Sequence, residues 1–141
     1  MHSPILLPAI VLVLWSLLML FWMAATRFAA MAKADVDLTS AVGGRGQDLE
    51  GVLPARVNWK AHNYTHLMEQ PTIFYPTVIV LALMGADTGI NLQLAWAYVV
   101  IRVLHSLVQA LWNRVVVRFA LFLVSTVVLS WLAIDALRAT L

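Results

Sequence analysis

The stretch PILLPAIVLVLWSLLMLFWMAAT, residues 4–26, contains no charged side chain. A helix needs about 20 predominantly apolar residues to cross the hydrocarbon core of a bilayer, and this run is long enough. A cleaved signal peptide is the competing interpretation, because small residues follow at 30–34. It is disfavoured because the apolar run is too long, no basic segment precedes it, and Arg27 follows at once. The stretch therefore predicts a transmembrane helix over residues 4–27.

The composition of the whole chain agrees with a membrane environment. Of 141 residues, 62% are hydrophobic and 11% are charged, and the mean hydropathy is +0.87. Soluble domains are closer to about 45–50% apolar and about 25% charged. A domain this small leaves much of its surface exposed, so the excess apolar surface must face lipid. The net charge of +2 with scattered basic residues argues against a nucleic-acid partner, and the absence of cysteine excludes disulfides and thiolate sites.

Three shorter apolar runs follow the first. The sequence predicts one all-α domain over residues 1–141, an integral membrane four-helix bundle with lipid as its surroundings. Its expected spans are about 4–27, 58–86, 90–112 and 114–137, with a polar loop at about 28–57. The loop carries most of the Lys and Arg outside the spans. By the positive-inside rule it should lie in the cytoplasm, which leaves both termini on the non-cytoplasmic side.

Each of the last three spans carries polar side chains in its cytoplasmic third. Within each span these side chains are three or four residues apart, so they share one helix face. They are His62, His66 and Glu69, then Arg102, His105 and Gln109, then Arg114 and Arg118. An ionisable group at membrane depth costs roughly 2.5–3.5 kcal/mol unless it faces the bundle interior or a wet cavity. We therefore expect these three polar helix faces to converge on a cytoplasm-facing pocket whose charge is mostly positive.

Simpler interpretations stand beside this one. Arg114 can extend to the headgroups as a snorkelling side chain. Glu69 and Arg102 can form a structural ion pair without any ligand. His62 and His66 have the spacing of a metal-binding pair, but no glutamate lies between them as in H-E-x-x-H, so we expect no metal site.

Two sequence blocks resemble a known family. The first is N-Y-x-H-L-x-E-Q-P-x-x-F-Y at residues 63–75, and the second is R-x-x-H-S at 102–106, followed by Asn113 and Arg118. In this order, on short polar spans, they are similar to the MAPEG family (membrane-associated proteins in eicosanoid and glutathione metabolism), in a bacterial-type member. The resemblance covers most of the chain.

The resemblance implies a homotrimer of four-helix subunits, here in a bacterial inner membrane, with both termini on the non-cytoplasmic side. Many members bind glutathione near the cytoplasmic face and transfer it to, or use it to isomerise, lipophilic small molecules that arrive from the bilayer. By position, the glutathione-binding residues would be Arg27, Glu69, Arg102, His105 and Arg118. Arg118 is the candidate catalytic residue, as the cation that stabilises a bound thiolate.

The chain departs from the family pattern at four positions. Thr65 and His66 stand where well-studied members have arginine and asparagine, and Gln109 and Phe122 stand where tyrosines are frequent. The resemblance implies a glutathione-dependent transferase or peroxidase, and these losses leave enzymatic activity open. The alternative is a non-catalytic membrane protein whose polar cluster stabilises a trimer or binds a lipid headgroup. An ion carrier is disfavoured, because the chain has neither an internal repeat nor a pair of broken spans.

Overall fold

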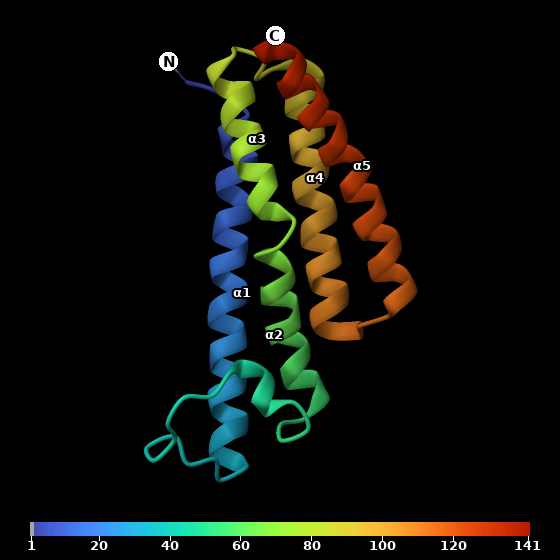
Figure 1. The fold of residues 1–141 in the computed structure, drawn as a ribbon. Coiled ribbons are helices and arrows are strands. Elements are labelled where there is room, and N and C mark those ends of the chain that lie inside the picture. Colours follow the sequence, from blue (N-terminus) through green and yellow to red (C-terminus); the bar gives the residue numbers. More distant parts are fainter. Residues whose placement is uncertain (1) are drawn as a thin grey trace.

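The computed structural model describes residues 2–141 and confirms that the chain is all-α (Figure 1). Each long helix follows an apolar run, because in lipid every backbone polar group must be satisfied within the segment. The elements are α1 (Leu6–Lys33), the 3₁₀ turn η1 (Gly46–Leu49), α2 (Ala55–Leu67), α3 (Pro71–Leu83), α4 (Gly89–Leu107), the π-helical turn η2 (Val108–Trp112) and α5 (Val115–Thr140).

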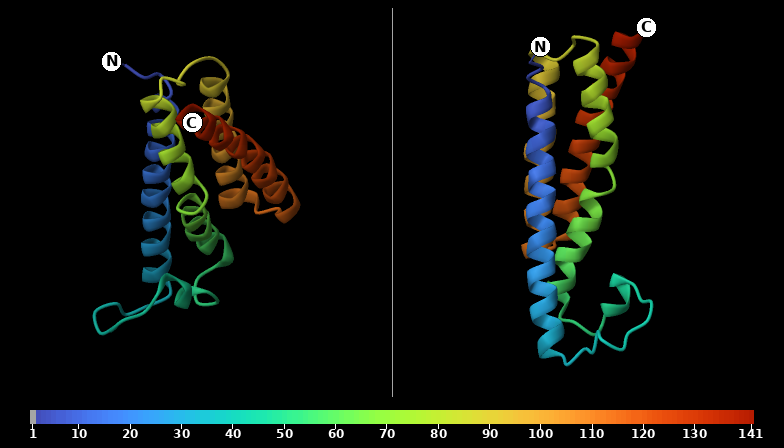
Figure 2. Two further views of the ribbon diagram at one scale, coloured as in Figure 1. Left: turned by 45° about the horizontal axis from the view of Figure 1, so that its top comes forward. Right: turned by 90° about the vertical axis from the view of Figure 1, so that its left-hand side faces the viewer.

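The helices stand as four upright rods, with α2 and α3 stacked end to end as one of them (Figures 1 and 2). Both chain ends lie at one end of the bundle, called here the terminal end. The loop 34–54 and the turn between α4 and α5 lie at the other, called the loop end (Figure 1). Helix α1, α4 continued by η2, and α5 have 28, 24 and 26 residues and are apolar enough to cross a membrane. The chain is therefore a membrane protein.

The stretch 58–86, expected as one span, is divided into two helices of 13 residues each. Pro71 lies at the division, because proline has no backbone N–H and its ring clashes with the carbonyl four residues earlier in a continuous helix. Helix α2 ends at Leu67, and the Met68 amide closes it by donating to the Thr65 carbonyl at 2.9 Å. Helix α3 then begins with Pro71 in its first turn, where proline is favoured. Residues 68–70 between the helices carry Glu69 into the site.

The apolar core lies between the rods on the terminal side of this break. Its centre is the ring pair of Phe74 and Tyr98, which stack with centroids 4.3 Å apart. Fully buried apolar side chains from α1 with its N-cap, from α3 and from α5 belong to the same core: Ile5, Leu12, Val78, Leu81 and Leu132. Many large apolar residues point outward along α1 and α5, as expected where lipid is the solvent.

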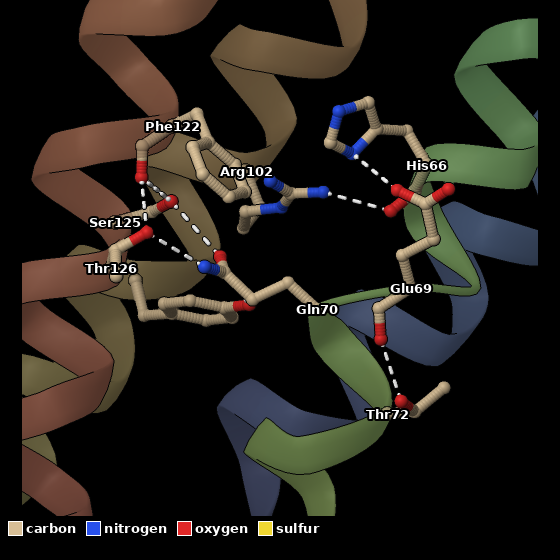
Figure 3. A network of polar contacts seen from close by, with 9 residues as sticks. His66, Glu69, Gln70, Thr72, Arg102, Phe122, Ser125 and Thr126 are labelled. Atoms are coloured by element: carbon tan, nitrogen blue, oxygen red, sulfur yellow. Dashed lines mark hydrogen bonds and ion pairs between the residues drawn. The ribbon is translucent and has the colours of Figure 1, made fainter.

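Gln70 ties three rods together at the break (Figure 3). Its Nε2 donates to Thr126 Oγ1 on α5 at 2.8 Å. Its Oε1 accepts from Tyr98 Oη on α4 at 3.2 Å and from Ser125 Oγ on α5 at 3.1 Å. This amide holds α5 and α4 against the start of α3, directly beside the polar cluster.

Replacing Gln70 with leucine is expected to destabilise the bundle by about 1–2 kcal/mol, since hydrogen bonds inside membrane proteins average roughly 0.6 kcal/mol each. The free energy of unfolding can be measured by titrating the protein from mild detergent into a denaturing one. Gln93→Leu is the matched control, because Gln93 is exposed on α4. Equal losses in the two variants would contradict the structural role of Gln70.

Candidate functional site

Side chains from three helices converge in the loop-end half of the bundle. The His66 ring, at the end of α2, lies 4.9 Å from the His105 ring on α4 and 5.8 Å from the Phe122 ring on α5, centroid to centroid. His105 is almost fully buried. The helical spacing of the polar residues thus places the His66 and His105 rings edge to face. Arg102 lies one turn before His105 on α4 and points toward His66 (Figure 3).

Arg102 is sealed inside the protein, with an exposed fraction of 0%. Its Nη2 donates to the His66 carbonyl at 3.0 Å, while Nε and Nη1 have no hydrogen-bond partner (Figure 3). The structural ion pair considered between Arg102 and Glu69 does not form: within residues 2–141, no carboxylate oxygen lies within 4.0 Å of this guanidinium. Glu69 Oε2 instead lies 3.4 Å from His66 Nδ1. Arg102 is a buried, incompletely satisfied cation that donates one hydrogen bond to the end of α2.

A cavity of about 500 Å³, called here the groove, opens between α1, α2 and the loop. Its ionisable lining residues are Arg27, Glu50, His62, Tyr64, His66 and Glu69. The Thr65 hydroxyl and the buried Gln109 also line it. The groove therefore offers charges of both signs and two hydroxyl groups. In the described part of the chain, no group of three or more His, Asp or Glu side chains is arranged to hold a metal ion.

A second cavity of about 260 Å³, called here the arginine pocket, lies on the other side of His66. It is lined by His66, His105, Val115, Arg118, Phe119 and Phe122, and none of these is acidic. Arg118 Nη1 donates to Asn113 Oδ1 at 2.8 Å, and its buried Nε has no partner. Asn113 has a φ of 56°, the left-handed conformation that asparagine tolerates and that ends η2.

The single positive pocket expected from the sequence is therefore two cavities that share His66. The arginine pocket has the expected positive sign. The groove does not, because two carboxylates, Glu50 and Glu69, line it together with one arginine, Arg27. Of the five predicted binding residues, Arg27 and Glu69 line the groove, Arg118 and His105 line the arginine pocket, and Arg102 lines neither.

The loop also contributes to the groove, which the helical spacing could not reveal. Gly46, Gln47 and Glu50 line it. Arg27 Nη2 donates to the Gly46 carbonyl at 2.8 Å, across 19 positions of sequence. Glu50 forms an ion pair with His62 of α2. No local pattern marks these loop residues, since their partners are distant in sequence.

Comparison with known proteins gives one match. The model of the MAPEG family matches residues 5–138, which is nearly the whole chain. No curated protein and no solved structure was found to match it.

Proposed function

Because the chain belongs to the MAPEG family, we propose that it is a glutathione-dependent transferase or peroxidase that acts on lipophilic electrophiles. The observation that carries this proposal is the groove. Its volume of about 500 Å³ lies within the range of roughly 300–1,000 Å³ typical of small-molecule sites. Glutathione is a tripeptide with two carboxylates and one ammonium group, so its charges call for a site of both signs.

The groove residues fit these groups. Arginine binds carboxylates by charge-assisted, often bidentate hydrogen bonds, and Arg27 is the arginine that lines the groove. Glu69, more than half exposed, is suited to the ammonium group. The hydroxyls of Tyr64 and Thr65 offer neutral hydrogen bonds in the same cavity. These two hydroxyls partly offset the tyrosines that the family often has at the positions of Gln109 and Phe122.

Arg118 is proposed as the catalytic residue. When bound, glutathione supplies a thiol that reacts as the thiolate, and this thiol is proposed to extend past His66, which lines both cavities, into the arginine pocket. Arg118 faces a cavity without a carboxylate, so its positive charge is free to stabilise negative charge on sulfur. Lowering a thiol pKa from about 8.5 to about 6.5 requires about 2.7 kcal/mol. His105 would orient groups in the same pocket, and Arg102 would act as a positioning residue by fixing the His66 carbonyl.

The lipophilic substrate is proposed to enter through the arginine pocket. Val115 and Phe119 line this cavity and are largely exposed on α5, one of the helices apolar enough to lie in lipid. A molecule dissolved in the bilayer would therefore meet an apolar entrance with Arg118 behind it.

We also propose that the loop end faces the cytoplasm of a bacterial cell, with both termini on the other side of the inner membrane. Of the nine Lys and Arg residues, all of which lie in the described part of the chain, only Arg138 belongs to a helix turn next to either terminus, the last turn of α5. The positive-inside rule depends on this asymmetry. A homotrimer is the proposed assembly, on the basis of family membership.

Glutathione is expected to raise the melting temperature of the detergent-purified protein. A ligand at ten times its Kd stabilises the folded state by about 1.4 kcal/mol. Glu69→Gln should abolish the shift, because it removes the charge proposed to bind the ammonium group. Asp87→Asn, in the turn at the terminal end, should keep it. Absence of any shift in the wild-type protein at millimolar glutathione would count against the proposed function.

The second candidate is a non-catalytic protein whose polar cluster holds a trimer together or binds a lipid headgroup. The packing of Phe122 against His66 favours it, because an apolar ring occupies the place of a frequent family hydroxyl. The same variant separates the candidates. A smaller trimer fraction in Glu69→Gln, together with an unchanged wild-type melting temperature in glutathione, would favour this second function.

A further inference from the structure

Part of the loop lines the groove on one side while most of its residues face solvent on the other. We call residues 46–53 the strap; they comprise η1 (Gly46–Leu49) and the turn that leads into α2. Figure 1 shows this segment passing in front of the lower parts of α1 and α2. Gly46, Gln47 and Glu50 form part of the groove lining. The strap is thus a wall of the cavity, not only a connection.

Side chains from two helices hold the strap. Arg27 of α1 donates to the Gly46 carbonyl at 2.8 Å, and His62 of α2 pairs with Glu50. Asn58 Nδ2 lies 3.3 Å from the Leu49 carbonyl and 3.4 Å from the Leu53 carbonyl, which anchors residues 49–53. Leu53 itself is buried. The backbone of residues 49–53 is therefore fixed in the protein, whereas the Gly46 end of the strap and the Glu50 side chain are held by one polar contact each.

Both of these contacts involve groups that also line the cavity. A Cβ on Gly46 would lie 2.8 Å from Arg27 Nη1, so only glycine allows the guanidinium to approach this closely. An anion that binds Arg27 in the groove must compete with the Gly46 carbonyl. His62 and Glu50 are both partly exposed, and exposed ion pairs are weak. The contacts are strong enough to favour closure and weak enough to be released.

We propose that the strap is a lid, which covers the loop end of the groove at rest and opens when Arg27 and His62 release Gly46 and Glu50. Its hinge is the anchored segment around Leu53. An anionic group that draws Arg27 away from Gly46 would loosen the lid, so ligand entry and lid opening would be coupled. The lid goes beyond the proposed function and does not depend on glutathione being the ligand, because the strap covers the groove whatever binds there.

The test uses the natural absence of cysteine. Ala61 lines the groove but is only 9% exposed, so Ala61→Cys places a single thiol under the lid. Its rate of modification by a charged, water-soluble methanethiosulfonate should rise about two- to fivefold when Glu50→Gln or Gly46→Ala is added, which is the effect of losing one exposed polar contact. The control is Val42→Cys, since Val42 is 98% exposed in the loop outside the strap; its rate should not change.

Unchanged modification of Ala61→Cys in both strap variants would overturn the lid. So would equal acceleration at Val42→Cys, because that would indicate general loosening of the loop. Gly46→Ala retains every charge and acts only by displacing Arg27, so it guards against a misfolded Glu50→Gln protein. The assay contains no glutathione, and its failure is therefore distinct from failure of the proposed function.

Discussion

Replacing Arg118 with glutamine is expected to lower glutathione-dependent turnover of 1-chloro-2,4-dinitrobenzene by about 100-fold at saturating glutathione and about pH 5.5, where the thiol is mostly protonated with or without the arginine. Glutamine keeps polarity and most of the length but removes the charge. Loss of about 2.7 kcal/mol of thiolate stabilisation corresponds to two powers of ten in rate. The reason lies in the arginine pocket, where no carboxylate neutralises this guanidinium and Asn113 holds it in place.

Arg114→Gln is the matched control for this experiment. Arg114 precedes Arg118 by one helical turn, is exposed, and has its guanidinium carbon 5.4 Å from the centre of the Trp112 ring. The same change of charge there should leave turnover unchanged. The pH dependence of turnover adds a second measurement, because a thiol without its stabilising cation ionises only at higher pH. Equal activity of Arg118→Gln and Arg114→Gln would remove Arg118 from the mechanism.

Replacing Arg102 with methionine is expected to stabilise the protein by about 2–4 kcal/mol while weakening the glutathione-induced melting shift. Two nitrogens of this sealed side chain have no partner, and each unsatisfied buried polar group costs roughly 1–3 kcal/mol. Methionine has a similar length and no polar group to satisfy. The His66 carbonyl still accepts from the Glu69 amide, so it does not lose all its partners. A stability gain of this kind is typical of a residue kept for function.

Melting scans at one fixed rate, with and without glutathione, can check this expectation. Arg102→Lys is the companion variant, because it retains the charge but not the planar group that reaches the His66 carbonyl. A large loss of stability in Arg102→Met would show instead that Arg102 is a structural brace. That result would favour the non-catalytic alternative, in which the cluster serves assembly.

The fold was largely predictable from hydrophobic runs, because lipid leaves a chain few ways to satisfy its backbone. The run at 4–26 predicted α1, although the helix continues past Arg27 to Lys33, one to two turns beyond the expected end. The division at Pro71 was not predicted. The apolar run and the polar segment before it were joined into one span, although Gln70-Pro71 carried a local signal for a helix end.

For the polar cluster, the sequence predicted only which side chains share a face of the same helix. Spacing of three and four residues placed His66 toward the bundle interior, as well as Arg102 and His105. It could not show that Arg102 would be sealed or that His66 would separate two cavities, because those depend on how the rods pack. No sequence pattern marked Gly46 or Glu50 as part of the site. Gly46 contacts Arg27, 19 positions earlier, and Glu50 contacts His62, 12 positions later.

The break at Pro71 bears on how the protein enters its membrane. Helix α3 has 13 residues and at 1.5 Å per residue extends about 20 Å, well short of a hydrocarbon core of about 30 Å. The polar α2 cannot supply the missing length on its own. During synthesis this segment is therefore a poor substrate for independent insertion by the translocon, and it should settle only once α4 has emerged to receive it. His66 and Glu69, which lie beside this break, should thus gain their final membrane environment only after α4 has entered the membrane.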